Sequence, residues 1–494
     1  MELYYGLEFV RPVLIYFALS SDESGIKPRL FKTFKIWLPY VLVIIGFTLF
    51  RILNKQDYAY PVAFFDHLKN SPLSAIIDLV IRIIEALSES LINVWIEIGL
   101  IFENISSPSD TIVLIGLIVL SFLITLALFL KLNKSEDTPP NQKKALGMMA
   151  LGSYVVLVAI IPFMVGELNV NLSFHGNRFL LPLGIGSSIA LVSFAEFMFI
   201  NKKARSVFVA IIIAFSVGAN IVNGFAYKKA WDEQKDFFAQ LTWRAPGIEP
   251  RTLVLTTTLP FELYFSGPSL TAPLNMIYAP DLKDNPIPYQ FLLAATPQME
   301  TMPDLIPNQS VDRSTRGFHF EGNTSDSVVI YLPQEGCLHV LAPDTDSKSF
   351  EELRYASIWN KIIPLSNLDL IKTNINSPSL PSEYFGEVSL NNWCYYYQKA
   401  SLNEQIEDWG NVIHYFELAR EKGFVPKDES EWLPLVNAYI HLEDYDTAIE
   451  LSQNINLDNL FTKQGLCSLW HGVQYLNEEQ KAEKDNLIHL WECD

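Results

Sequence analysis

Cysteine is scarce in this sequence of 494 residues: there are four, and none lies in the first half. They are Cys337, Cys394, Cys467 and Cys493, and no two of them form a Cys-x-x-Cys pair. This spacing argues against a zinc site and against a thioredoxin-type motif. Outside the cytoplasm a disulfide is permitted, and the first pairing that we expect there is Cys337 with Cys394. Free buried thiols are the alternative, because connectivity does not follow from spacing.

The signature motifs of several enzyme classes are also missing. There is no P-loop, no Gly-x-Gly-x-x-Gly after a strand, no His-Glu-x-x-His and no Gly-x-Ser-x-Gly. The eight histidines are scattered along the chain. We therefore expect neither a metal site nor a bound cofactor.

Positive charge is sparse in the second half. Residues 1–226 carry 17 Lys and Arg against 16 Asp and Glu, whereas residues 227–494 carry 19 against 39. The net charge of −19 therefore belongs to the second half. Phosphate groups would be repelled there, which argues against a nucleic-acid partner and suits a water-soluble domain.

Long apolar runs, in contrast, fill the first half. A run of about 18 or more apolar residues with few charges predicts a membrane-spanning helix. Residues 1–226 therefore predict an α-helical polytopic bundle in contact with the lipid bilayer. The five runs are roughly residues 36–53, 111–131, 145–166, 179–200 and 206–225.

Lys and Arg predict how these spans are oriented. They gather before the first span, between the second and third, and between the fourth and fifth. Because cytoplasmic loops are enriched in Lys and Arg, all three connections are expected in the cytoplasm, and the alternation fits five spans. We thus expect a multi-pass protein of the cell membrane, with residues 227–494 extracytoplasmic.

Residues 73–103 form a long aliphatic stretch with one polar stripe. Three interpretations are open: an amphipathic helix in the outer interface, a helix packed among the others with its stripe on a water-filled cavity, or a further span. We favour the interface. For residues 4–20 two interpretations are open, a short span and an interfacial helix. The stripe steps by three or four residues through Asp78, Arg82, Glu85, Glu89, Asn93 and Glu97.

Residues 227–390 predict an extracytoplasmic mixed α/β domain. Short β-type runs at 252–258, 327–332 and 337–342 are separated by turn residues. Residues 228–243 are expected to be helical.

Residues 391–494 predict a helical domain. Residues 391–455 fit two helix pairs, and the tail fits one more. Trp409 and Tyr445 are 36 residues apart, near the roughly 34 of a tetratricopeptide repeat. The segment resembles two degenerate units of this kind, and an ordinary helical bundle is the alternative. Two units would need to pack on the rest of the domain.

The connection at residues 166–186 carries the first candidate site. Arg178 and His175 at headgroup level could bind a lipid phosphate. Glu167, or Asp66 in an earlier outside loop, is the candidate catalytic acid or base. The alternative for Arg178 is an interfacial anchor.

A resemblance supports that site. The stretch 177–186, NRFLLPLGIG, is similar to a signature of polytopic, GT-C-type membrane mannosyltransferases with C-terminal tetratricopeptide repeats. Arg178 and Pro182 match the family's Arg and Pro, Gly184 or Gly186 matches its Gly, and Asn177 replaces an acidic residue. The resemblance implies a glycosyltransferase-like protein acting on lipid-linked sugars.

The chain departs from that family in two respects. The acidic motif of the family's first outside loop is not matched, since Asp57, Asp66 and His67 are not arranged as paired carboxylates. Several N-terminal spans also have no counterpart, which would suit a fragment, a split partner or a degenerate relative.

A second candidate site lies in the soluble half. Trp243, Arg244, Asn275 and Tyr278 are groups suited to contact sugars or peptides. The alternative is that they pack the domain against the membrane. The sequence segments around these residues, together with residues 336–341 and 391–400, resemble an uncharacterised family of bacterial multi-pass envelope proteins. This resemblance implies an architecture and not an activity.

Two functions follow as hypotheses. The first is a role in envelope glycan or lipid-linked sugar metabolism, as a diverged or partial glycosyltransferase-like protein. The alternative is a non-catalytic membrane-anchored scaffold whose residues 391–494 bind a partner protein. Transport is less favoured, because the spans hold few charges and show no inverted repeat.

Overall fold

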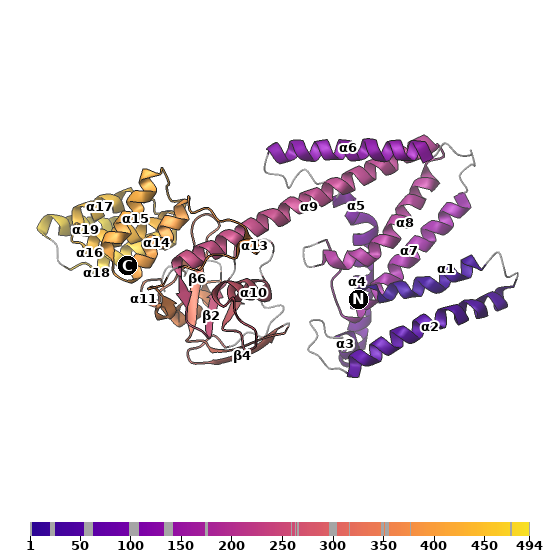
Figure 1. Ribbon diagram of the computed structural model, residues 1–494, viewed down its shortest axis with the longest axis horizontal. Coiled ribbons are helices and arrows are strands. Elements are labelled where there is room, and N and C mark those ends of the chain that lie inside the picture. The colour runs from indigo at the N-terminus through magenta and orange to yellow at the C-terminus, as the bar shows by residue number, and fades with distance from the viewer. Residues whose placement is uncertain are drawn as a thin grey trace. The chain divides into compact units, whose positions relative to one another are not determined.

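The structure is a computed structural model in which the chain forms two compact units, Met1–Ala226 and Tyr227–Asp494 (Figure 1). The boundary coincides with the change in charge composition. Each unit is described by itself. The described residues are 2–19, 25–53, 63–97, 108–132, 142–172, 176–257, 259–261, 263, 266–295, 304–315, 317–346, 350, 355–375, 377–474 and 477–493.

Among the described residues, five helices are long and apolar enough to cross a membrane, which confirms the expected number of candidate spans. A helix satisfies its own backbone hydrogen bonds, so its apolar side chains can face lipid at no polar cost. The apolar part of the last helix is residues 206–225, and its portion from Tyr227 onward belongs to the second unit. The helices are α2 (Ile26–Leu53), α6 (Pro108–Leu132), α7 (Gln142–Val165), α8 (Leu180–Met198) and α9 (Lys202–Arg244).

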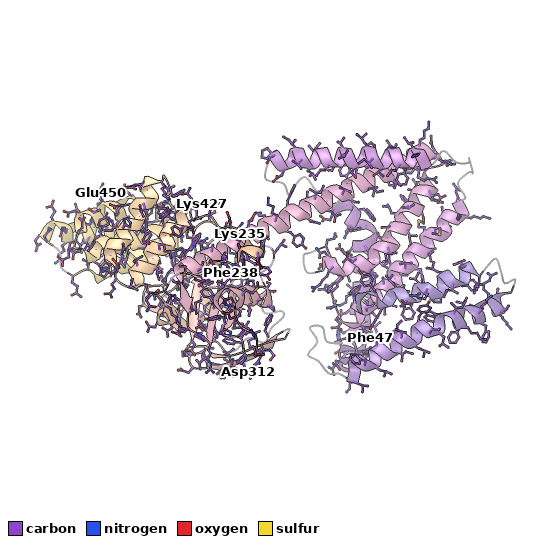
Figure 2. The ribbon with its side chains drawn as sticks, viewed as in Figure 1. Phe47, Lys235, Phe238, Asp312, Lys427 and Glu450 are labelled. Carbon is purple, nitrogen blue, oxygen red and sulfur yellow. A yellow bond between two sulfur atoms is a disulfide. The ribbon has the colours of Figure 1, made fainter. Side chains whose placement is uncertain are left out.

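Two phenylalanines show how the units differ (Figure 2). Phe47 on α2 is 38% exposed, as is usual for a helix whose partner is lipid. Phe238 in the second unit is 0% exposed and lies in its interior, while Asp312 and Glu450 lie on the surface. The first unit thus turns apolar side chains outward and the second buries them.

Helices α7 and α8 pack closely because two glycines face each other (Figure 1). A Cβ atom on Gly152 would lie 2.7 Å from the carbonyl oxygen of Gly186, and one on Gly186 would lie 2.6 Å from that of Gly152. Small residues at a helix crossing allow this backbone approach in membranes.

The N-terminal residues form η1 (Glu2–Phe9) and α1 (Val10–Ala18), which pack on α7. The Tyr154 hydroxyl donates a hydrogen bond to the Phe9 carbonyl oxygen at 3.0 Å. With nine residues in α1, the N-terminal segment is a short helical pair against α7 and not one long helix.

The aliphatic stretch forms one nearly continuous helical segment after α3 (Ala63–Asn70). It comprises α4 (Pro72–Ser88), a π-helical turn η2 (Glu89–Asn93) and α5 (Val94–Glu97). Leu79, Ile83 and Ala86 pack against α7 and α8, and the Ser187 hydroxyl donates to the Ser90 carbonyl oxygen at 2.5 Å. The segment therefore packs on α7 and α8, and its position relative to the bilayer stays a prediction. Residues 98–103 lie outside the described residues.

The second unit contains the small sheet expected of a mixed α/β domain. Its strand order is β3-β2-β6-β7, with β2 parallel to β3 and to β6, and β7 antiparallel to β6. The expected strands correspond to β2, β6 and β7, whereas β3 and two short pairs, β1–β8 and β4–β5, were not predicted. The strands are β1 (Gly247–Ile248), β2 (Thr252–Thr256), β3 (Tyr289–Leu293), β4 (Ser310–Thr315), β5 (Phe318–Asn323), β6 (Ser327–Tyr331), β7 (His339–Val340) and β8 (Ile371–Lys372).

Both faces of the sheet are covered, which explains why β2 and β3 are apolar and buried throughout. On one face lie Phe237 of α9 and Leu270 of α10, and on the other Phe350 and Trp359. The helices and turns around the sheet are α10 (Gly267–Tyr278), α11 (Pro343–Asp346), α12 (Ala356–Ile362), η5 (Ile363–Leu365), η6 (Leu368–Leu370) and α13 (Ser382–Phe385).

Three helix pairs end the chain, in agreement with two expected pairs and a helical tail. Asp408 and Asp444 each cap the second helix of a pair by accepting a backbone N–H, and each follows a glutamate of positive φ. These local features recur at the 36-residue spacing. The helices are α14 (Trp393–Gln405), α15 (Trp409–Glu421), η7 (Glu429–Trp432), α16 (Leu433–His441), α17 (Tyr445–Asn454), α18 (Leu460–Gly472) and α19 (Glu478–Leu490).

Two disulfides join elements of the second unit. The expected Cys337–Cys394 pair is confirmed, with a Cα–Cα distance of 5.4 Å, and it ties the segment before β7 to α14. Cys467 and Cys493 form the second pair, at 5.5 Å. The alternative of free buried thiols is therefore wrong.

Candidate functional site

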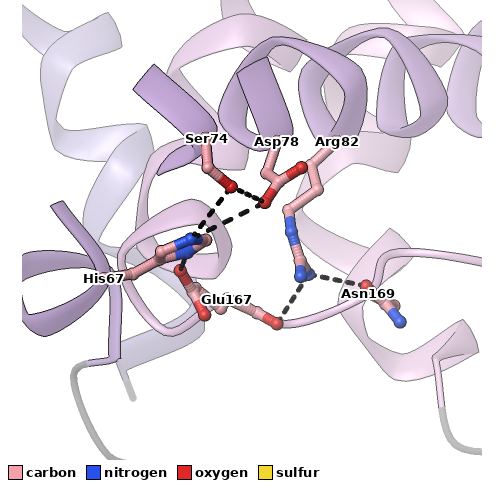
Figure 3. Close-up of polar contacts among 6 residues, drawn as sticks. All are labelled: His67, Ser74, Asp78, Arg82, Glu167 and Asn169. Atoms are coloured by element: carbon pink, nitrogen blue, oxygen red, sulfur yellow. Dashed lines mark hydrogen bonds and ion pairs between the residues drawn. The ribbon is translucent and has the colours of Figure 1, made fainter. Parts of the chain in front are cut away.

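A cluster of polar side chains lies where α3, α4 and the connection after α7 meet (Figure 3). His67 Nδ1 lies 2.9 Å from a carboxylate oxygen of Glu167. On its other side, His67 Nε2 lies 3.4 Å from the Ser74 hydroxyl and 3.8 Å from the Asp78 carboxylate. Arg82 Nη1 donates to the Glu167 carbonyl oxygen at 2.8 Å and to Asn169 Oδ1 at 2.7 Å.

The local sequence explains how α4 presents these groups. Ser74, Asp78 and Arg82 are four residues apart, which places them on one face of the helix. The Ser74 hydroxyl also lies 3.4 Å from the Asp78 carboxylate. Pro72 stands at the start of α4, where a missing backbone N–H costs nothing. His67 lies in the last turn of α3, directly before this start.

Glu167 is held in an unusual backbone conformation. Its φ is +51°, in the left-handed region where a residue with a Cβ is strained. The conformation ends α7, because it lets the Leu168 N–H donate to the Phe163 carbonyl oxygen at 2.9 Å. Arg82 then holds the Glu167 carbonyl. Strained residues gather at functional sites, and Glu167 is a strained residue within this cluster.

The arrangement supplies the groups of general acid–base chemistry. A carboxylate beside one imidazole nitrogen orients the ring, and an imidazole can transfer protons to a bound molecule. His67 and Glu167 keep side-chain exposures of 30% and 23%, so a ligand can reach them. Among the described residues, no group of three His, Cys, Asp or Glu is placed to hold a metal ion.

The other residues predicted for this site, Asp66, Arg178 and His175, are not among the described contacts of the His67–Glu167 cluster. Asp66 is exposed on α3, one residue before His67, and is not among the contacts of the cluster. Arg178 is exposed in η4 (Asn177–Phe179), on the connection that also carries Glu167. Its guanidinium lies 5.0 Å from the ring centre of Phe179, which is buried. His175 lies outside the described residues.

The four predicted ligand contacts of the second unit have separate environments. Asn275 uses its side chain to join α10 to β3, donating to the Tyr289 carbonyl oxygen at 2.7 Å. The Tyr278 hydroxyl donates to the Ala245 carbonyl oxygen at 2.8 Å. Trp243 packs edge-on against Tyr395. Arg244 is 3% exposed and lines a cavity.

Sequence reasoning missed the meeting of His67 with Glu167. Asp78 and Arg82 were recognised as part of a polar stripe, but their partners were not. A stripe of charge on an otherwise aliphatic helix was the available signal, because charges in a membrane-embedded segment need partners.

In the part of the chain that the structure describes, five helices are long and apolar enough to cross a bilayer, which supports a membrane protein, and the second unit contains a small sheet. A scan against protein-family models, a search of curated proteins and a search of solved structures each found no match.

Proposed function

We propose that this protein acts in cell-envelope glycan or lipid-linked sugar metabolism, as a diverged relative of polytopic glycosyltransferases. The observation that supports the proposal most is the His67–Glu167 pair, at 2.9 Å, because Glu167 lies on the connection that also carries Arg178. A proton-transferring pair and an exposed guanidinium that share this connection match the needs of a substrate with a lipid phosphate.

In this proposal each residue has a separate role. Arg178 binds the lipid phosphate through its guanidinium, together with His175. Glu167, acting with His67, is the acid or base, and exposed Asp66 is the alternative. Arg82 is a positioning residue, because it holds the Glu167 carbonyl oxygen and not the reacting group.

The proposal places residues 227–494 outside the cytoplasm. The Lys and Arg of three connections support this orientation. The two disulfides support it as well, because disulfides persist in oxidising compartments and are rare in the cytosol.

The test is binding of a polyprenyl-phosphate sugar to the purified, detergent-solubilised protein. We expect the wild type to bind and Arg178→Ala to bind at least about tenfold more weakly, since a charge-assisted hydrogen bond is lost. Arg205→Ala is the matched control, because Arg205 in the first turn of α9 pairs with Glu196 near the end of α8, at helix ends that the proposal places on the cytoplasmic side.

Two outcomes would contradict the proposal. The first is no binding by a folded wild-type protein. The second is equal losses in Arg178→Ala and Arg205→Ala. Either would leave the scaffold hypothesis, in which the three helix pairs of residues 391–494 bind a partner protein, and co-purification from cross-linked membranes would then be the experiment.

A further inference from the structure

The second unit encloses a cavity of about 390 Å³ that the proposed function does not use. It lies among the end of β7, α11 and the helices α14, α16 and α18. Its volume falls within the roughly 300–1,000 Å³ of small-molecule sites. The polar and aromatic lining includes Arg244, His339, Asp346, Tyr397, Glu404 and Trp409.

Two buried side chains in this lining have unused hydrogen-bonding atoms. Arg244 is 3% exposed and donates from Nη1 to Gln405 Oε1 at 2.7 Å, but its Nε has no hydrogen-bond partner among the described residues. His339 is 7% exposed, and its Nδ1 pairs with the Tyr397 hydroxyl at 2.9 Å, whereas its Nε2 is likewise unpaired in the described part of the chain. Native proteins pair nearly all buried polar atoms, so two exceptions in one cavity wall are unusual, although neither atom exposes surface to the cavity.

The charges of the wall favour a neutral ligand. Arg244 is the one guanidinium in the lining, and the carboxyl groups of Asp346, Glu404 and Glu407 lie in the same lining. An anion would therefore meet three carboxyl groups, and a cation would meet the guanidinium. Burial lowers the pKa of His339 to about 4, so its ring is uncharged at neutral pH.

The carboxyl groups are placed to accept hydrogen bonds from a ligand as well as from the protein. Glu404 accepts from Asn437 Nδ2 at 2.8 Å, and Asp346 accepts from the Ala342 N–H at 2.7 Å. Each carboxylate has further lone pairs. Burial raises the pKa of Asp346 to about 6 and raises the pKa of Glu404, because the buried ionised carboxylates lose their solvation. A hydroxyl that donates a hydrogen bond to either carboxylate would stabilise its ionised form.

An aromatic wall completes the site. Trp409 and His441 both line the cavity, and their rings stack at 4.0 Å between centres with 13° between planes. A flat apolar surface among hydrogen-bonding groups suits a molecule with apolar C–H faces and polar edges.

We propose that this cavity binds a neutral polyhydroxylated molecule of the size of a mono- or disaccharide. Each hydroxyl both donates and accepts, so such a ligand can donate hydrogen bonds to Glu404 and Asp346 together. The inference does not rest on the proposed function, because it concerns a cavity within the second unit and needs no lipid phosphate.

The experiment uses the full chain in a detergent without a sugar headgroup. Binding of glucose, mannose, N-acetylglucosamine and maltose is measured by saturation-transfer NMR and calorimetry, beside glucuronate, glucosamine and inorganic phosphate. We expect at least one neutral saccharide to bind. Its Kd should rise at least tenfold in Glu404→Gln and in Trp409→Ala.

Matched variants distinguish this site from a general loss of folding. Glu421→Gln makes the same change at an exposed position of α15, and Tyr445→Ala removes the aromatic residue that follows Trp409 by 36 residues. Both should bind as the wild type does. The proposal is overturned if no neutral saccharide of the panel binds folded protein, if only the charged probes bind, or if the cavity variants bind as tightly as the controls.

Discussion

His67 Nδ1 and a carboxylate oxygen of Glu167 lie 2.9 Å apart although 100 residues separate them in the chain. The contact joins the last turn of α3 to the connection that follows α7. It is the only hydrogen bond of His67 Nδ1 among the described contacts, so the pair can be tested by removing either side chain.

The His67–Glu167 pair should show an energetic coupling. In a double-mutant cycle of His67→Ala and Glu167→Gln, we expect about 0.5–1 kcal/mol of interaction free energy, as for a partly exposed hydrogen bond. Thermal unfolding in detergent measures it. His67→Ala combined with Glu85→Gln, an exposed carboxyl of the same stripe, should be additive. Additivity in both cycles would mean that the contact carries no free energy.

The Cys337–Cys394 disulfide should stabilise the second unit more than Cys467–Cys493. The two bridges span 57 and 26 residues, and loop-entropy arguments give about 4 and about 3.5 kcal/mol. We expect Cys337→Ser with Cys394→Ser to lower the unfolding temperature most, as measured by thermal scans with and without reductant. Non-reducing peptide mass spectrometry checks the pairing, and a different connectivity would refute it.

Glu431 should make stability depend on pH. Its side chain is 0% exposed and accepts from the Cys337 N–H at 2.6 Å and from Trp393 Nε1. Burial raises its pKa from the ordinary 4.5 to about 7, against the lowering effect of these donors. Between these values the folded protein holds more protons than the unfolded chain, so this contribution to stability falls as pH rises from about 4.5 to about 7.

The measurement compares the wild type with Glu431→Gln at pH 5 and pH 8. The glutamine does not titrate, so the wild type should lose up to about 3 kcal/mol relative to the variant over this interval. His339 contributes the opposite trend, because its lowered pKa of about 4 makes stability rise through the acidic range. That contribution is present in both proteins and cancels. A pH-independent difference would show that Glu431 is ionised at both pH values.

Glu443→Gly should stabilise the helical region. Glu443 has φ of +61° after α16, and a residue with a Cβ is strained there by about 1 kcal/mol, whereas glycine is not. We expect a gain of about 0.5–1 kcal/mol in thermal or denaturant unfolding. Glu450→Gly, on the exposed face of α17, is the control, because glycine destabilises a helix interior. This variant should lose about 1 kcal/mol of unfolding free energy. Equal effects would contradict the strain argument.

Local pattern was sufficient for much of the architecture. The five spans were predictable because an apolar run of sufficient length must form a helix in lipid, whatever its neighbours are. Strands β2, β6 and β7 were visible as apolar runs between turn residues. In contrast, β3 was missed although residues 289–293 are buried throughout, because a short apolar run can equally belong to a buried helix.

For the candidate sites too, some features followed from the sequence and others only from the tertiary structure. The sequence alone determined that Asp78 and Arg82 share a helix face, that residues 227–494 carry the acidity, and that Trp243 and Arg244 are groups suited to contact sugars or peptides. The tertiary structure decided that His67 meets Glu167, that Cys337 pairs with Cys394, and that Arg244 lines one cavity with His339. The reason is physical: periodicity and charge act over a few residues, whereas these contacts join segments 57 to 100 residues apart, and their geometry depends on how the helices and the sheet pack.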